Sequence, residues 1–146
     1  MTYASLILAA ALKAKVSGTL LLAICTVETN LTNVVVYHDG KSPSYGICQI
    51  KLGTAKMMGF KGKAEELVNP MVNAKFAAKY LKYQQNRYNV NDNVNDKNLY
   101  KAIAAYNAGS YIERTKGVPV NLRYLTKVRV RLKENLQSKT SCDKVE

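Results

Sequence analysis

Residues 21–29 read LLAICTVET, and this stretch decides the fold. Residues three, four and seven positions apart lie on one face of an α-helix. The positions that share this face are Leu21, Ile24, Cys25 and Glu28. Glutamate is seldom buried unless it is paired or has a chemical role, so a carboxylate at the end of an apolar stripe is unusual. The stretch therefore predicts a packed helix that ends at one buried carboxyl group.

The position of Glu28 favours a protonated carboxyl group. Burial disfavours the charged form, and the partial negative charge at the C-terminal end of a helix does the same. Both effects raise the pKa of Glu28, and a general acid needs a raised pKa to hold a proton near neutral pH. Periodicity alone leaves open a surface position or an ion pair with a lysine.

The remaining pattern is mostly helical, with apolar residues at helical spacing and capping residues at the ends. Asn69-Pro70 is a typical helix start, and Gly109 is a typical helix stop. A β-branched run and the Asp39-Gly40 pair predict an extended segment with a turn over residues 30–44, and at most a small β-hairpin. We expect helices over residues 3–15, 19–29, 54–58, 70–88, 96–107 and 121–137. The ranges that start at 96 and 121 include the capping residue.

The 146 residues, of which 47% are hydrophobic, are enough for one domain with one core. We expect a mainly α single domain over residues 1–137 and a flexible C-terminal tail over residues 138–146. The polar loop over residues 89–96 lacks the glycine and the bidentate glutamate of a calcium loop, so we expect no calcium site there. His38 is the only histidine, and we expect it at the surface.

The three cysteines, Cys25, Cys48 and Cys142, show no pairing pattern. An odd number without a C-x-x-C pair describes neither a disulfide framework nor a zinc site. We therefore expect free thiols and no metal site, in a chain made in a reducing cytosol.

The chain carries 22 lysines and arginines against 10 acidic residues, which gives a net charge of +12. Such a charge favours an anionic partner: nucleic acid, an anionic membrane or an anionic wall polymer. The basic residues are scattered without a long run, which argues against a nucleic-acid-binding arm. Arg123, Lys127 and Arg131 recur at four-residue spacing and predict a basic face on the last helix.

Five motifs occur in an order and spacing that are specific only when taken together. They are LLAI with Glu28-Thr29; GICQI at 46–50 with Thr54-Ala55; Asn69-Pro70 with Asn73, Ala77 and Tyr80-Leu81; AYNAG at 105–109; and YLTKV at 124–128. This series resembles the catalytic domain of soluble lytic transglycosylases, in the lysozyme superfamily. The resemblance implies a mainly α, lysozyme-like single domain, similar to a bacteriophage endolysin.

The resemblance also implies a role for each matching residue. Glu28 matches the acid/base that cleaves the β-1,4 bond between N-acetylmuramic acid and N-acetylglucosamine in peptidoglycan and forms 1,6-anhydromuramic ends. Gln49 and Asn107 match sugar-contacting amides, and Tyr106 matches a tyrosine whose hydroxyl reaches the catalytic carboxyl. The family's substrate-side serine is matched by Ser44, with the nearby Ser42 as the alternative. No cofactor or metal is implied.

The sequence departs from the family pattern at three places. Thr29 stands in place of a serine, Lys51-Leu52 in place of Met-Pro, and the loop before Gln49 is longer. That loop carries Asp39, and goose-type lysozymes, which resemble this family, have an aspartate in this neighbourhood that activates water. A hydrolase with Asp39 as base is therefore one alternative. An inactive basic wall-binding module on the same scaffold is the other, and the intact Glu28 argues against it.

The expected setting follows from the N-terminal part of the chain and from the resemblance. The apolar runs at 6–12 and 20–24 are each too short to span a bilayer, and lysines follow the first run rather than precede it. We expect no signal peptide, and a monomer that is made in a host cytoplasm or packaged in a virion and acts on the cell wall. The expected partners are peptidoglycan glycan strands and an anionic wall or outer-membrane surface, without nucleic acid.

Overall fold

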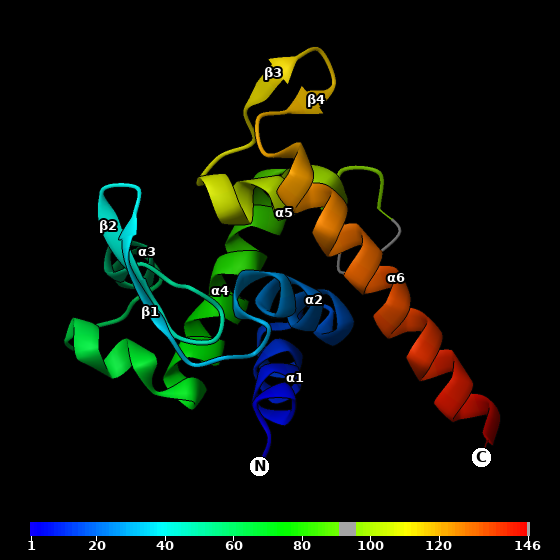
Figure 1. Ribbon diagram of the computed structural model, residues 1–146, viewed down its shortest axis with the longest axis horizontal. Coiled ribbons are helices and arrows are strands. Elements are labelled where there is room, and N and C mark those ends of the chain that lie inside the picture. The colour runs from blue at the N-terminus through cyan, green and yellow to red at the C-terminus, as the bar shows by residue number, and fades with distance from the viewer. Residues whose placement is uncertain (91–95, 146) are drawn as a thin grey trace.

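The computed structural model describes the backbone of residues 1–90 and 96–145, and the side chains of residues 1–90 and 96–138. Within these residues the fold is mainly α, with two small antiparallel hairpins (Figure 1). The helices are α1 (Tyr3–Ala14), α2 (Gly18–Thr29), α3 (Leu52–Met57), η1 (Ala64–Val68, a 3-10 helix), α4 (Pro70–Arg87), α5 (Leu99–Ala108) and α6 (Leu122–Val145). The strands are β1 (Val35–Asp39), β2 (Ser42–Tyr45), β3 (Glu113–Thr115) and β4 (Val118–Pro119).

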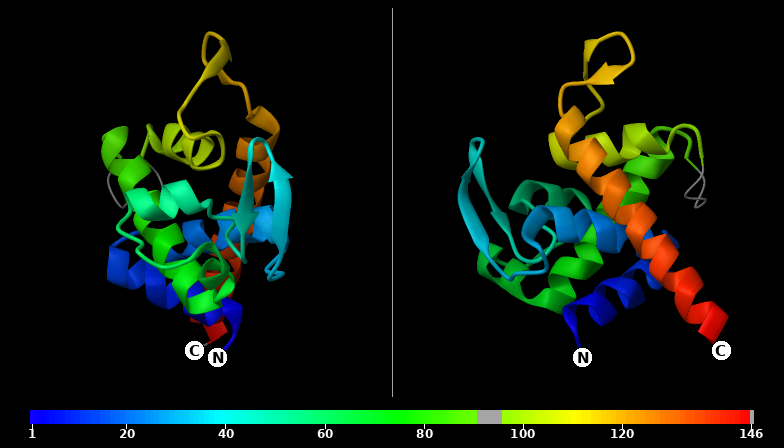
Figure 2. Two further views of the ribbon diagram at one scale, coloured as in Figure 1. Left: turned by 90° about the vertical axis from the view of Figure 1, so that its left-hand side faces the viewer. Right: turned by 45° about the vertical axis from the view of Figure 1, so that its right-hand side comes forward.

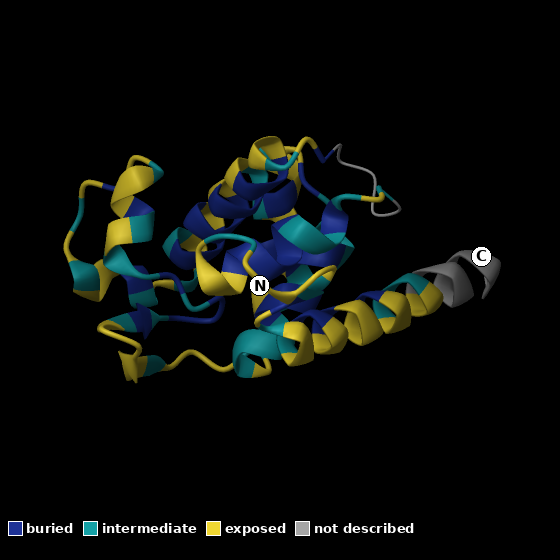
Figure 3. Cartoon of the chain, turned by 90° about the horizontal axis from the view of Figure 1, so that it is seen from above, coloured by how far each residue is buried: buried dark blue, intermediate teal, exposed yellow. Residues whose placement is uncertain are grey.

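Helix α2 lies at the centre of the fold. It packs against α1, α4 and α6, and its buried residues are Leu20, Leu21, Ala23, Ile24 and Cys25. The predicted apolar face of α2 is confirmed, because Leu21, Ile24 and Cys25 are fully buried. Figure 3 shows that α6, as far as residue 138, is buried along one side and exposed along the other.

The predicted helix ends follow ordinary capping chemistry. Asn69 caps α4 by accepting hydrogen bonds from the backbone N–H groups of Met71 and Val72, and Pro70 occupies the first turn. Helix α5 ends at Gly109, whose φ of 89° lies in the region that favours glycine. Asp96 accepts a hydrogen bond from the N–H of Asn98 at the start of this helix.

The predicted extended segment forms the β1–β2 hairpin. The register pairs Val35 with Tyr45 and Asp39 with Ser42, and an irregularity falls between Val36 and Asp39. The hairpin stands beside α2 and α3, at the opposite side of the molecule from α6 (Figure 2). It therefore brings Asp39 and Ser44 to one side of the end of α2.

Some elements differ from the prediction. Helix α6 continues to Val145, beyond the predicted end at 137, and the side chains of residues 139–146 lie outside the described residues. The short helix η1 and the β3–β4 hairpin were not expected. Most of the predicted polar loop over residues 89–96 also lies outside the described residues. His38 is exposed, as expected.

The prediction of free thiols was wrong for two of the three cysteines. Cys25 and Cys48 form a disulfide across 23 residues. The error arose because α2 and the loop after β2 meet only in the folded chain. No helix in the described part of the chain is both long and apolar enough to span a membrane.

Candidate active site

The structure brings the five predicted site residues to one cleft. Glu28, Ser44, Gln49, Tyr106 and Asn107 all line it, and its volume is about 260 Å³. They come from the end of α2, from β2, from the loop after β2 and from the end of α5. Asp39, at the end of β1, lines the same cleft. The cleft therefore contains two carboxyl groups, which is the number that glycosidic-bond chemistry ordinarily employs.

The Glu28 carboxyl lies in the last turn of α2 and is only partly exposed to the cleft. Burial raises its pKa from 4.5 to about 7. A smaller effect of the same sign comes from the negative charge of Asp39, and the hydroxyl of Tyr124 acts in the opposite direction. The group is therefore close to half protonated at neutral pH, which suits a residue that first donates and later accepts a proton.

Two tyrosines lie beside Glu28 and differ in what their hydroxyls do. Tyr106 is buried and donates its hydroxyl proton to the carbonyl oxygen of Cys48 at 3.1 Å. Its proton is therefore directed at Cys48, although the charge of Glu28 acts on the Tyr106 hydroxyl and raises its pKa further. The hydroxyl of Tyr124 also approaches the Glu28 carboxyl. It is fully buried and interacts with Glu28, although it has no partner at ordinary hydrogen-bond geometry.

The role of Tyr124 was not predicted. Tyr124 opens the fifth motif of the sequence, but its distance from Glu28 along the chain gave no sign of contact. It lies in the first turn of α6, which packs against α2. Burial raises the pKa of the Tyr124 hydroxyl well above its usual value, and the negative charge of Glu28 adds to the shift.

The loop that carries Gln49 is held by a buried asparagine. Asn73 of α4 donates from its Nδ2 to the carbonyl oxygens of Tyr45 and Leu67, both at 2.7 Å, and accepts from the N–H of Cys48 at 2.9 Å. A Cβ atom at Gly46 would lie 2.4 Å from that Nδ2, and φ at Gly46 is 77°. Glycine is therefore required where the loop passes over α4.

The Gln49 side chain faces the cleft with its acceptor free. Its Nε2 donates to the carbonyl oxygens of Gly46 at 3.0 Å and Val34 at 3.3 Å. Both bonds engage the nitrogen, so the Oε1 atom is available to a ligand. Thr29, which follows Glu28, donates its hydroxyl to the carbonyl oxygen of Ile47 at 2.7 Å and so ties the end of α2 to the same loop.

The Asn107 side chain offers hydrogen-bond donors to the cleft, whereas Gln49 offers an acceptor. Its Oδ1 accepts a hydrogen bond from Nδ2 of Asn121 at 3.0 Å, which directs the Nδ2 donors of Asn107 elsewhere. Asn121 also donates to the carbonyl oxygen of Ala104 at 2.9 Å, so it holds the last turn of α5. The cleft therefore offers an amide acceptor from Gln49 and an amide donor from Asn107.

The backbone after Asn107 is held by a buried polar network. Gln84, which is fully buried, donates to the carbonyl oxygens of Ala105 and Gly109 and to the hydroxyl of Tyr80. Arg87 donates to the same Gly109 oxygen at 2.8 Å. This support was not predicted, because Gln84 has no distinctive spacing in the sequence.

The hairpin side of the cleft is held by Asp39. Its Oδ2 accepts the hydroxyl proton of Ser44 at 2.6 Å, and the Lys51 ammonium donates to its backbone oxygen. Ser44 is 1% exposed, so its hydroxyl mainly orients Asp39. Among the described residues, no group of three or more histidine, cysteine, aspartate or glutamate side chains could hold a metal ion.

Comparison with known proteins agrees with the family that the sequence motifs indicate. The family described as the transglycosylase SLT domain matches residues 5–118. An X-ray structure of an inactive mutant of the lytic transglycosylase Slt from Pseudomonas aeruginosa has the same fold, with a TM-score of 0.74 at 20% sequence identity. The match covers 93% of this chain and 24% of that one, so this chain spans about a quarter of that relative's length. No curated protein matches the chain.

Proposed function

Because this chain belongs to the transglycosylase SLT domain family, a family of peptidoglycan lytic transglycosylases, we propose that it cleaves glycan strands with Glu28 as its single acid/base. The bond that breaks is the β-1,4 bond between N-acetylmuramic acid and N-acetylglucosamine. The observation that carries this proposal is the position of the largely buried Glu28 carboxyl on the wall of a polar cleft, beside the amides of Gln49 and Asn107, and this burial raises its pKa to about 7.

The first step needs the protonated form of Glu28. The carboxyl gives its proton to the glycosidic oxygen, the bond from that oxygen to C1 of the muramic acid breaks, and the N-acetylglucosamine part leaves with a new hydroxyl. The positive charge that develops at C1 is met by the substrate's own acetamido oxygen. A second protein carboxylate is not needed for this step, in contrast to an ordinary retaining glycosidase.

The second step uses the ionised form of the same group. Glu28 takes the proton from the C6 hydroxyl of the muramic acid, whose oxygen then bonds to C1 and closes a 1,6-anhydro ring. The proton returns to Glu28, so the cycle consumes no water. A group with a pKa close to the working pH serves both steps, because neither protonation state is costly to reach.

The two amides of the cleft suit the substrate. Hydroxyl and acetamido groups offer both donors and acceptors, and the cleft provides the free Oε1 of Gln49 and the Nδ2 donors of Asn107. We assign these two side chains to sugar binding. Ser44 is assigned to the same side of the site through Asp39, which it orients.

A second candidate function is hydrolysis. It is favoured by the position of Asp39, whose charge reaches Glu28 and which lines the same cleft. An ionised Asp39 could activate water on the opposite face of the sugar, as in an inverting glycosidase. The protein would then be a lysozyme rather than a lyase.

Mass spectrometry of digested peptidoglycan tests the proposal. Lytic cleavage gives muropeptides that are lighter by one water than hydrolytic products and resist reduction by borohydride. Products that reduce normally favour hydrolysis. If no glycan product forms at all, both functions are wrong, and a wall-binding role for the basic scaffold remains.

The proposed place of action is the cell wall of a bacterial host, reached from the host cytoplasm or from a virion. The partner is the glycan strand, and the net charge of +12 suits an anionic wall or outer-membrane surface as well. Neither step requires a cofactor.

A further inference from the structure

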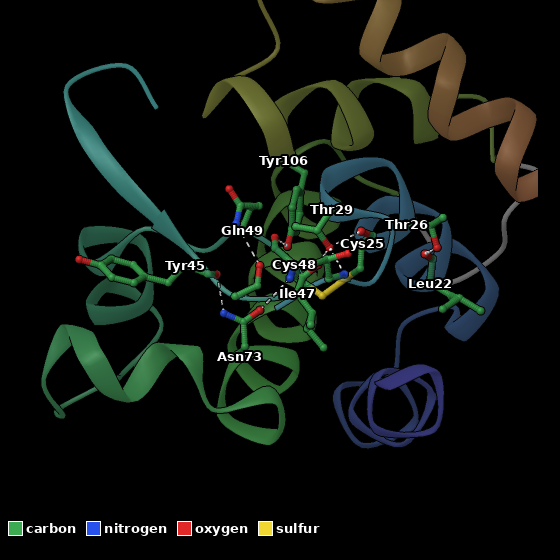
Figure 4. The surroundings of a disulfide bond; sticks show 12 residues. Leu22, Cys25, Thr26, Thr29, Tyr45, Ile47, Cys48, Gln49, Asn73 and Tyr106 are labelled. Carbon is green, nitrogen blue, oxygen red and sulfur yellow. Dashed lines mark hydrogen bonds between the residues drawn. A yellow bond between two sulfur atoms is a disulfide. The ribbon is translucent and has the colours of Figure 1, made fainter. Parts of the chain in front are cut away.

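The Cys25–Cys48 disulfide joins the two segments that carry Glu28 and Gln49 (Figure 4). Cys25 lies one turn before Glu28 on the same face of α2. Cys48 is the residue directly before Gln49, and the Cα atoms of the two cysteines are 4.4 Å apart. The bond therefore holds the turn of α2 that precedes the acid/base against the loop that carries the sugar-binding amide.

The other contacts between these segments are hydrogen bonds. The hydroxyl of Thr29 reaches the carbonyl oxygen of Ile47, and Cys48 is held through its own backbone by Asn73 and Tyr106 (Figure 4). The last two contacts attach the loop to α4 and α5 rather than to α2. Among the described residues, the disulfide is the covalent link between the helix of the acid and the loop of the amide.

We propose that this disulfide is a positioning link for the reaction, so that the chain is fully active only in its oxidised form. The inference rests on the proposed function. When the bond forms, the two thiols give two electrons and two protons to a disulfide-containing oxidant, which is released as two thiols. The oxidant belongs to the class of thiol–disulfide exchange partners, such as an oxidoreductase or glutathione disulfide.

The burial of the two cysteines determines when and in which compartment the disulfide can form. Cys25 and Cys48 are both 0% exposed, so a thiol reaches them only when the core opens. The redox state is therefore set while the chain folds or re-opens, and it persists in the folded protein. A chain that folds in a reducing cytosol lacks the link, and a chain that folds or re-opens in an oxidising compartment acquires it. Full activity therefore requires that the chain fold or re-open under oxidising conditions.

The disulfide should affect the rate because the acid and the sugar-binding amide must keep their position relative to each other. A misplacement of about 1 Å between catalytic and binding groups can reduce the rate by roughly 100-fold. Glu28 and Gln49 are both still present without the bond, so the reduced protein should bind substrate and turn it over slowly. We expect kcat to fall by about tenfold and KM to stay within about twofold, as partial misplacement predicts.

The test compares one polypeptide in two redox states. A Cys142→Ser background removes the third thiol, and the chain is refolded either with glutathione disulfide or with a phosphine reductant. Thiol titration confirms the two states, and circular dichroism confirms that both are folded at the assay temperature. Steady-state cleavage of soluble glycan oligomers then gives kcat, KM and the pH profile of kcat. In the reduced form the alkaline fall of kcat should also begin at a lower pH, because a looser site hydrates Glu28 and lowers its pKa.

A Cys25→Ala/Cys48→Ala variant provides the matched control. It should have the kcat of the reduced form and should not respond to reductant, and it replaces the reduced form if that form does not stay folded. If a folded, bond-free protein has the kcat and pH profile of the oxidised protein, the disulfide only stabilises the fold and the inference is wrong. An oxidised protein without glycan-cleaving activity would instead overturn the proposed function, and this inference with it.

Discussion

Glu28 and Asp39 line the same cleft from α2 and from the β1–β2 hairpin, and the negative charge of Asp39 raises the pKa of Glu28. The larger cause of the raised pKa is burial of the Glu28 carboxyl, and the Tyr124 hydroxyl opposes both effects. The working pH of the site is thus set by the burial of Glu28 at the end of α2 and by two neighbours, Asp39 and Tyr124, that come from distant parts of the chain.

Removing the charge of Asp39 should shift the pH profile. Glu28 must be protonated for the first step, so kcat falls as the pH rises through the pKa of Glu28, which is about 7. Asp39→Asn removes a like charge that favours the protonated form, so this alkaline limb should move to lower pH. Steady-state rates from pH 4 to 9 measure the shift. Asp96→Asn, which lies outside the cleft lining, is the control and should leave the limb where it is.

Removing the hydroxyl of Tyr124 should have the opposite effect. This hydroxyl lowers the pKa of Glu28, so Tyr124→Phe should move the alkaline limb to higher pH. At pH 5, where Glu28 is protonated, the variant should lose little stability, because the buried hydroxyl has no partner at ordinary hydrogen-bond geometry. Tyr106→Phe breaks a buried hydrogen bond to Cys48 and should cost about 1 kcal/mol. Equal destabilisation by the two variants would contradict this assignment of the two hydroxyls.

Replacing the acid itself should remove activity and leave the fold. Gln in place of Glu28 keeps the shape of the side chain but has no proton to donate, so turnover should fall by roughly 10²- to 10⁴-fold. The folded state raises the pKa of Glu28, so its ionisation destabilises the wild type as the pH rises from 4.5 to about 7. Glu28→Gln should therefore be as stable as the wild type at low pH and more stable at pH 8. Retention of more than a few per cent of activity, with an unchanged circular dichroism spectrum, would show that another group is the acid.

The excess positive charge should make wall lysis sensitive to salt. Arg123, Lys127 and Arg131 lie on α6, and all three are exposed. Screening shortens the range of these charges from about 10 Å at 0.1 M salt to about 3 Å at 1 M. The rate at which a suspension of cell walls clears should fall over this range, and Arg123→Gln/Lys127→Gln should reduce the slope. Arg131 is less informative because it is paired with Glu134 at 3.1 Å. A rate that is independent of salt would mean that charge plays no part in association.

The parts of the fold that could be predicted are those with a local cause. The spacing of Leu21, Ile24 and Cys25 predicted the buried face of α2, and the same spacing placed Glu28 at the end of that face. Asn69 and Gly109 predicted helix ends, since capping depends on a few neighbouring residues. Glu28, Gln49, Tyr106 and Asn107 could be chosen because they lie in motifs that follow one another in a recognisable order, and Ser44 was chosen by its position just before the second motif.

The parts that could not be predicted depend on contacts between distant segments. Three cysteines allow three possible pairings or none, and only the fold brings Cys25 and Cys48 together. The approach of Tyr124 to Glu28 requires the packing of α6 on α2. The buried amide of Gln84 looked like an ordinary polar helix residue, although it holds the backbone beside the cleft.

The products should be 1,6-anhydromuropeptides, and Asp39 should not be needed to make them. Hydrolysis requires a base that activates water, and Asp39 is the only acid other than Glu28 among the residues that line the cleft. Its Oδ2 already accepts the hydroxyl proton of Ser44 at 2.6 Å, so one acceptor position of the carboxylate is occupied and not free to take a proton from water. The C6 hydroxyl belongs to the same sugar as C1, and such proximity is worth several kcal/mol over free water, of the roughly 7–11 kcal/mol that ideal orientation provides.

Asp39→Asn separates the two reactions. In a lyase the variant should still form anhydro products, lighter by one water and resistant to borohydride, with only its pH profile shifted. Ser44→Ala is the matched control, since it frees the Asp39 carboxylate from its hydrogen bond and should raise any water-activating ability that Asp39 has. If wild-type products are reducible, Asp39→Asn abolishes them and Ser44→Ala does not, then Asp39 is the base. The enzyme would in that case be a lysozyme that carries a water-activating aspartate on its hairpin.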